Sequence, residues 1–201
     1  MKLTAKIFTS LDGVYQGPGA PDEDRRGGFE RGGWQAFHAD EVVGEYITSA
    51  YEQADALLLG RVTWEIWEAY WPHHDDNPIG HTINTLPKYV PTTTRRETSW
   101  QRTHFVSDDV EGAVRRLKAE PGRDLLSQGS GALVRWLLER DLLDELALIV
   151  YPVVVGDGLR LFPEHGPSHT MELVESVATP AGITIQTLRP AGRARFGRVD
   201  D

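Results

Sequence analysis

The chain has 201 residues, of which 40% are hydrophobic and 25% are charged, the composition of an ordinary globular protein. Its net charge of -9 disfavours nucleic acids and anionic membrane surfaces as partners, although local arginines can still bind a phosphate group. Because cysteine is absent, disulfides, thiolate metal sites and cysteine nucleophiles are excluded. The first apolar run is too short for a signal peptide and no run is long enough to span a bilayer, so we expect a cytoplasmic protein.

The spacing of apolar and turn-forming residues predicts strands that alternate with helices. In the first half we expect a strand over 3–9, a glycine-rich loop over 18–33, a helix over 40–54 capped by Asp40, a strand from Ala56, a helix from Thr63 to Tyr70, an irregular polar segment over 73–87, and short strands over 88–90 and 103–106. In the second half we expect a helix over 108–118 capped by Asp108 or Asp109, a strand over 123–128, a helix over 132–140, a strand over 145–155, and a hairpin of strands over 171–177 and 183–188.

This order predicts an α/β fold with a mostly parallel central sheet, flanked by helices and extended by a C-terminal antiparallel hairpin. We expect one domain over residues 1–190, followed by a basic, mobile tail over residues 191–201.

The turn that follows the expected strand at Ala56 carries Gly60, Arg61 and Thr63. Glycine lets a ligand approach the backbone, arginine offers a guanidinium fork, and threonine can cap the next helix. Together with free helix N–H groups, these residues suit a phosphate. The alternative is a buried strand with an ordinary cap and a surface arginine.

A second turn of the same kind joins the strand over 123–128 to the next helix. It contains Gly129, Ser130 and Gly131, and Ala132 and Leu133 open the helix. This is not a complete G-x-G-x-x-G fingerprint, and a lone Gly-Ser-Gly is also found in tight turns. Two such turns between strands and helices nevertheless indicate a nucleotide site, since open α/β sheets bind ligands at these points.

Asp12 and Trp34 are the candidate residues for substrate contact and chemistry. Asp12 ends the first strand and could face the cleft, or it could bond to its own turn before Gly13. The segment from Gly17 to Trp34 is long enough to be a lid that is mobile without ligand and closes over the bound ligands. In that case Trp34 contacts the substrate; the alternative is a passive insertion with Trp34 anchored in the core.

Two other patterns have simpler explanations. The run from His73 to Asp76 lacks a spaced partner for a metal ion, so a polar loop explains it better and we predict no metal site. Trp64, Trp67 and Trp71 could stack on a flat ring, but their helical spacing favours core packing for most of them.

Short segments spread in order over nearly the whole chain match the motifs of a known family. They are Ser10–Gly13, Gly28–Glu30 with Gly32–Trp34, Ala54–Arg61, Tyr70–Pro72, Pro87–Val90, Gly129–Leu133 and Tyr151–Gly158. The ordered set resembles the dihydrofolate reductase-like superfamily, and more closely bacterial proteins related to the reductase domain of riboflavin biosynthesis, the RibD C-terminal domain.

This resemblance implies NADPH as the hydride donor. It places Gly60, Arg61 and Thr63 near the adenosine phosphates, and the segment from Gly129 through Ser130, Gly131 and Ala132 to Leu133 around the pyrophosphate. Relatives often carry Ser-Arg after the next strand, whereas this chain has Thr92 and Thr93. Thr92 keeps a hydroxyl, but the missing arginine leaves the choice between NADP and NAD open.

The function that follows is an NADPH-dependent reductase of a small heterocycle, pteridine- or pyrimidine-like, or of a carbonyl or imine compound. Asp12 or a bound water would supply the proton. The alternative is a non-catalytic nucleotide-binding or regulatory protein on the same fold. We also expect a homodimer, because the strand over 146–155 and the terminal hairpin are more apolar than one small sheet face needs, and because relatives commonly pair through this region.

Overall fold

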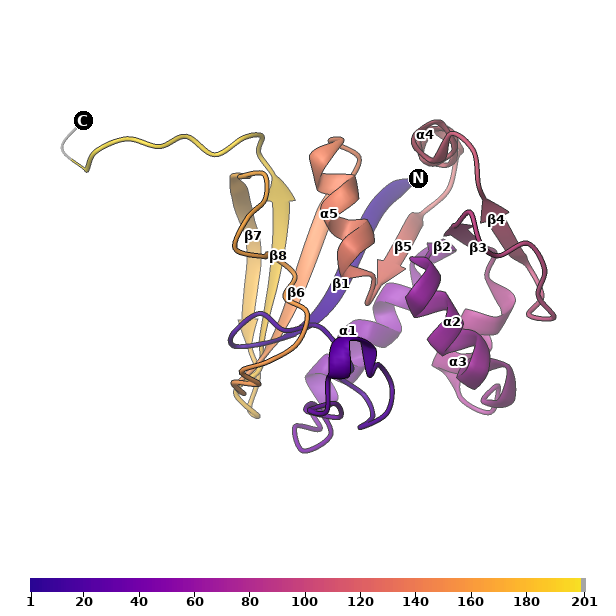
Figure 1. Cartoon of the computed structure of the whole chain (residues 1–201), viewed down its shortest axis with the longest axis horizontal. Helices are drawn as coiled ribbons and strands as arrows, with labels where there is room; N and C mark the ends of the chain where they lie inside the picture. Colours follow the sequence, from indigo (N-terminus) through magenta and orange to yellow (C-terminus); the bar gives the residue numbers. More distant parts are fainter. Residues whose placement is uncertain (200–201) are drawn as a thin grey trace.

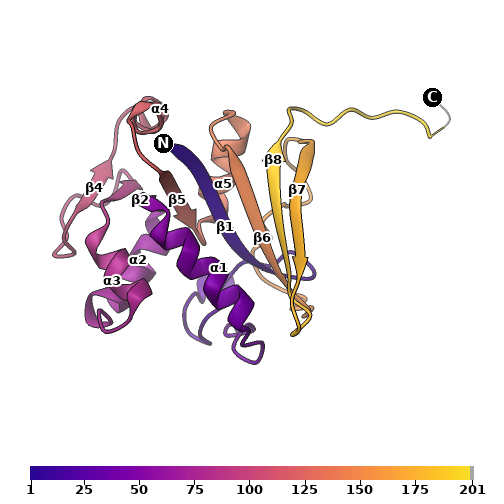
Figure 2. The same cartoon turned by 180° about the vertical axis from the view of Figure 1, so that it is seen from behind.

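The computed structural model describes residues 1–199, which form one eight-stranded sheet with helices on both faces (Figures 1 and 2). The strand order is β4-β3-β2-β5-β1-β6-β8-β7. The strands are β1 (Lys2–Ser10), β2 (Ala54–Leu58), β3 (Lys88–Pro91), β4 (Thr103–Val106), β5 (Asp124–Gln128), β6 (Glu145–Tyr151), β7 (Met171–Ala178) and β8 (Thr184–Pro190). Pairing is parallel from β4 to β6, and β8 runs antiparallel to both β6 and β7. The predicted fold class is confirmed.

The sheet separates two apolar cores. The helices are α1 (Glu41–Glu52), α2 (Arg61–Tyr70), α3 (Pro78–Thr85), α4 (Val110–Ala119) and α5 (Gly131–Glu139), with short 3-10 turns η1 (Arg26–Gly28) and η2 (Trp71–His73). One core joins the sheet to α1, to Ile83 of α3 and to Trp64 of α2, and the other joins it to α4 and α5. Figure 2 shows α1 in front of the sheet and Figure 1 shows α5 in front of the opposite face. Central strands buried on both faces explain the continuous apolar runs in the sequence.

Two of the predicted helix caps are confirmed. The carboxylate of Asp40 accepts a hydrogen bond of 3.2 Å from the N–H of Val43, and that of Asp109 accepts one of 3.0 Å from Gly112. Such bonds satisfy backbone N–H groups that have no partner within the helix.

The prediction of an irregular segment over residues 73–87 is wrong, because α3 lies within it. The side chain of Asn77 accepts a 2.9 Å hydrogen bond from the N–H of Gly80, and Pro78 occupies the first helical position. The signal was the pair Asn77-Pro78, a capping residue followed by a proline whose fixed φ suits the first turn. The polar composition of the segment masked it.

We call residues 17–34 the flap; they lie below the carboxyl ends of the central strands in Figure 1. Trp34 is only 8% exposed, its Nε1 donates a 2.9 Å hydrogen bond to the carbonyl of Gln16, and its ring packs edge-to-face on Tyr151. Phe29 is buried as well. In the chain without ligand the indole of Trp34 is thus a core anchor, as the alternative of a passive insertion expects, and its contact with substrate stays a prediction.

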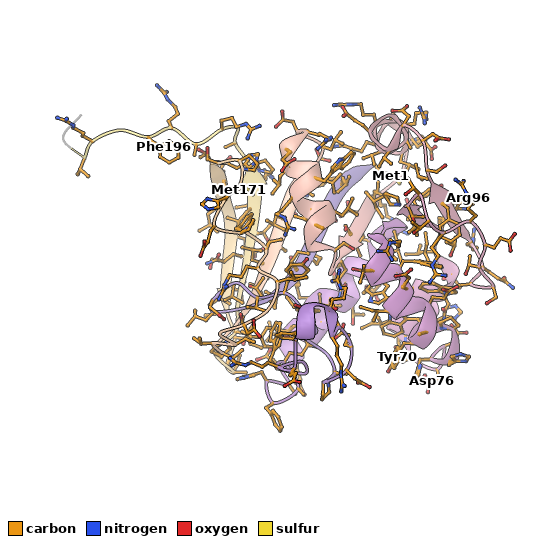
Figure 3. All side chains as sticks on the ribbon, viewed as in Figure 1. Met1, Tyr70, Asp76, Arg96, Met171 and Phe196 are labelled. Carbon is orange, nitrogen blue, oxygen red and sulfur yellow. The ribbon has the colours of Figure 1, made fainter. Side chains whose placement is uncertain are left out.

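Residues 191–199 extend away from the sheet beyond β8, with Phe196 exposed on the outer part of this segment (Figure 3). The last two positions of the predicted tail, 200–201, lie outside the described residues. Over the described 1–199 range, none of the helices has the length and hydrophobicity that crossing a membrane requires.

Replacing the flap anchor is expected to destabilise the fold. Trp34→Ala removes a buried ring and its hydrogen bond, which should lower the free energy of unfolding by about 3–5 kcal/mol in urea denaturation. Phe37→Ala, just beyond the flap, is the control, because Phe37 is 95% exposed and its loss should change little. If Trp34→Ala unfolds at the same urea concentration as the wild type, the anchor role is contradicted.

Candidate functional site

The two glycine turns lie side by side because the strands that precede them are neighbours. β2 and β5 pair in parallel, with Leu57 opposite Leu126, so the Gly60 and Gly129 turns leave the same edge of the sheet. The hydroxyl of Ser130 joins them: it accepts a 2.9 Å hydrogen bond from the N–H of Gly60 and donates one of 3.0 Å to the Thr63 hydroxyl.

Glycine is favoured at both turns for different reasons. A Cβ on Gly60 would lie 3.3 Å from the Cβ and Oγ of Ser130, closer than an ordinary contact. Gly129 has φ +70°, a left-handed conformation that side chains with a Cβ rarely adopt.

Two helices begin at these turns with their N-termini directed at the same space. α2 begins at Arg61 with Gly60 as its N-cap, so the expectation that Thr63 caps it is wrong. α5 begins at Gly131 with Ser130 as its N-cap. Gly60 has no side chain to cap α2, and the Ser130 side chain accepts no hydrogen bond from α5. Backbone donors and the positive ends of two helix dipoles therefore remain available to an anion.

A cavity of about 340 Å³ lies between the turns and the flap. It is lined at one end by the two turns, from Gly60 to Thr63 and from Gly129 to Leu133, including Ala132. Aromatic rings and two amides line it elsewhere: Phe8, Trp67, Trp71, Gln35 and Gln128. The flap side contributes Tyr15, Gly17, Pro18, Gly19, Glu23, Asp24 and Arg26.

The three tryptophans of the 64–71 segment differ in burial and in what they contact. Trp64 is fully buried, which agrees with core packing, but Trp67 and Trp71 are half-buried and line the cavity. Helical spacing could not separate them, because one face of α2 meets the core and the adjoining face meets the cavity.

Arg61 lines the cavity, but Thr92 does not. The Thr92 hydroxyl is buried and accepts hydrogen bonds from the N–H groups of Thr94 and Arg95. Arg95 then bonds Glu65 at 2.8 Å, and Glu65 bonds Arg61 at 2.7 Å. The segment after β3 thus carries a positive charge on Arg95, three residues beyond Thr92. The sequence analysis considered only Thr92 and Thr93 at this place and missed Arg95.

Asp12 is absent from the residues lining the cavity, and its carboxylate closes a turn. It accepts hydrogen bonds from the hydroxyl of Ser10 and from the N–H groups of Val155 and Gly156. Burial raises the pKa of Asp12, but these hydrogen bonds outweigh it and hold the pKa well below its usual range. Asp12 therefore takes the turn role that was the alternative for it, and it does not line the cavity in which a proton donor is needed.

Gly131 also has a structural reason that the sequence did not reveal. An ideal Cβ there would lie 2.6 Å from the ring of Tyr15, which forms the wall of the cavity above the turn. Tyr15 follows Gly13 by two positions, in a segment without periodicity, so no pattern marked it.

The His73–Asp76 run lies around η2 and the start of α3, where His81 contacts Asp75 at 3.3 Å. Across residues 1–199, no group of three or more histidine or carboxylate side chains is placed to hold a metal ion.

Comparison with known proteins identifies the family. The family model named RibD C-terminal domain matches residues 1–185. Two proteins of Bacillus subtilis strain 168, the uncharacterized proteins YyaP and YwjB, are 28% and 29% identical over 141 and 133 residues. The matches cover 68% and 62% of this chain and 74% and 70% of those proteins.

Solved structures agree on the fold. A putative riboflavin biosynthesis protein from Shewanella sp. PV-4 matches with a TM-score of 0.71 and 22% identity, over 94% of this chain and 99% of that one. A pyrimidine reductase-like protein from Corynebacterium diphtheriae matches with a TM-score of 0.61 and 12% identity, over 97% and 92%. The riboflavin biosynthesis reductase Rib7 of Saccharomyces cerevisiae matches with a TM-score of 0.57 and 16% identity, over 94% and 90%. The chain therefore belongs to the RibD C-terminal domain family and has its dihydrofolate reductase-like fold.

Proposed function

We propose that the protein is an NADPH-dependent reductase whose cofactor lies across the carboxyl ends of β2 and β5. The observation that carries this proposal is that α2 and α5 both begin at one cavity without a side-chain cap, and that Ser130 joins their two turns. Free backbone N–H groups beside glycines suit a pyrophosphate. Membership of a family whose structural neighbours include a riboflavin biosynthesis reductase supports the same reading.

The residues divide into two groups along the cofactor. Gly129 to Leu133 would hold the pyrophosphate through backbone N–H groups, and Gly60 and Thr63 would bound the adenosine side. Arg61 lines the cavity and is linked through Glu65 to Arg95, so these two arginines, rather than Thr92, are the charged groups proposed to meet a 2′-phosphate.

The aromatic rings and amides that line the cavity suit a flat substrate. Phe8, Trp67 and Trp71 offer apolar ring surface, and the amides of Gln35 and Gln128 offer hydrogen bonds. These groups fit a small heterocycle or a carbonyl or imine compound. The bound nicotinamide would supply the hydride, while the protein positions the substrate and excludes water.

A proton must also reach the reduced substrate. Among the carboxyl groups that line the cavity, burial raises the pKa of Glu23, whereas Asp24 is bound to Arg26 and its pKa is lowered overall because those hydrogen bonds outweigh burial. The Glu23 carboxylate also accepts hydrogen bonds from the N–H groups of Gly19 and Ala20, but unlike Asp12 it lines the cavity. We therefore propose Glu23, or a bound water, as the proton source in place of Asp12.

The alternative is a non-catalytic nucleotide-binding or regulatory protein that uses the same turns. The position of Asp12 outside the cavity favours this alternative, because it removes the acid first expected there. Oxidation of NADPH in the presence of candidate heterocycles, followed at 340 nm, separates the two: a reductase consumes cofactor and a regulatory protein only binds it.

Cofactor titration tests the site before a substrate is known. We expect NADPH to bind with a Kd of about 1 μM, near -8 kcal/mol. Arg61→Ala should weaken NADPH binding by about tenfold or more, and NADH binding much less, because a guanidinium beside a 2′-phosphate recognises that group. Arg115→Ala is the matched control: it removes an arginine from an i,i+4 pair with Glu111 on α4, outside the cavity. Equal losses for both cofactors would contradict this role of Arg61.

We also propose a homodimer that pairs through β7. The apolar side chains of β6 on which the expectation partly rested are mostly buried in the chain's own core, so they are not free for a partner. β7 is an edge strand of eight residues that exposes Leu173, Val174 and Val177. A long apolar edge strand is a template for strand pairing.

Sedimentation at micromolar concentration should give twice the 22.5 kDa mass of the chain. Leu173→Lys should shift the species toward one chain, because it places a charge on the paired edge. Phe37→Lys changes an apolar residue just beyond the flap that is more exposed than Leu173, and it should leave the mass unchanged. A wild type that sediments as a single chain would refute the dimer.

A further inference from the structure

The flap carries an arginine into the cavity together with its own counter-ion. Nε of Arg26 donates a 2.8 Å hydrogen bond to Oδ1 of Asp24, and its Nη2 donates one of 2.6 Å to Oδ2. Both side chains line the cavity that the two glycine turns also line. Both carboxylate oxygens thus accept hydrogen bonds from one edge of the guanidinium. A phosphate group would bind the same edge in the same bidentate geometry.

The backbone that carries this pair is fixed to the body of the protein. Gln16 is 2% exposed, and its Nε2 donates hydrogen bonds to the carbonyls of Asp24 and Arg26, while its Oε1 accepts one from Leu159. Phe29, buried in the core, secures the chain after η1. Arg26 is therefore held over the cavity by a buried framework.

Tyr15 connects Arg26 to the phosphate turn. Its ring lies against Gly131, and Tyr15, Arg26 and Gly131 all line the same cavity. The guanidinium therefore shares this cavity with the start of α5, where the N–H donors of that helix are free of a side-chain cap. An anion at this position would meet backbone donors on one side and the arginine on the other.

We propose that Arg26 is a cofactor-binding residue and that Asp24 occupies its anion site in the free chain, so that Asp24 and a phosphate of the dinucleotide compete for the same guanidinium. This inference rests on the proposed function, since it takes the anion to be the cofactor. It adds a third element, the flap, to the two turns that the sequence indicated. A pair that only stabilises the turn over residues 24–26 would leave cofactor affinity unchanged.

The test is a double-mutant cycle read by NADPH titration in the full-length protein. Arg26→Gln should weaken NADPH binding by about tenfold, because a charge-assisted hydrogen bond is lost. Asp24→Asn should strengthen binding several-fold, because the guanidinium is released. In the double variant the gain from Asp24→Asn should disappear, since there is no longer an arginine to release. Arg25→Gln, an exposed neighbour that does not line the cavity, is the control for overall charge.

Each result decides the proposal. A gain from Asp24→Asn that persists without Arg26 would mean a general charge effect and would overturn the competition. Wild-type binding with both single variants within twofold of it would overturn the role of Arg26 and leave the reductase proposal standing. Binding by Asp24→Asn but not by the wild type would support the competition strongly. Failure of every variant to bind millimolar NADPH would overturn both proposals. Melting temperatures of all variants establish that the compared proteins are folded.

Discussion

The close approach of Gly60 to Ser130 organises the rest of the site. A Cβ on Gly60 would lie 3.3 Å from Ser130, a tight contact that would push apart the two groups that share the hydrogen bond between the turns. This contact places the N-termini of α2 and α5 beside each other, at the point where parallel β2 and β5 end. Everything proposed for the cofactor depends on that convergence of backbone donors, which no single side chain could supply.

The charges around the cavity explain how an acidic chain could hold an anionic ligand. The net charge is -9, yet Arg61, Arg95 and Arg26 gather near the two turns, each paired with Glu65 or Asp24. Asp24 balances the charge of Arg26, whereas Arg61 and Arg95 share Glu65 and together keep one net positive charge. The affinity for an anionic ligand should therefore depend more on these local charges than on the net charge of the whole chain. Added salt should weaken the effect of the local charges and the effect of the net charge.

The fold was predictable because its signals are local or periodic. Continuous apolar runs marked the buried parallel strands, and Asp40 and Asp109 marked two helix starts by ordinary capping chemistry. The adjacency of the Gly60 and Gly129 turns followed from strand–turn–helix order together with the family resemblance. α3 was missed because its capping pair stands in a polar segment, where amphipathic spacing is weak.

The residues that sequence reasoning misplaced are those whose roles depend on partners distant in the chain. Asp12 is held by Val155 and Gly156, and Trp34 by Tyr151, contacts between segments more than a hundred residues apart. Arg26 likewise reaches the cavity only through the path of the flap.

A crystal structure of the protein with NADPH would show directly where the cofactor lies. We expect the pyrophosphate to contact the backbone N–H groups at the start of α5, between the Gly60 and Gly129 turns, with the nicotinamide toward Phe8 and Trp67. A cofactor bound elsewhere on the sheet, with the N–H groups of Ser130, Gly131 and Ala132 left without contact to it, would contradict the account.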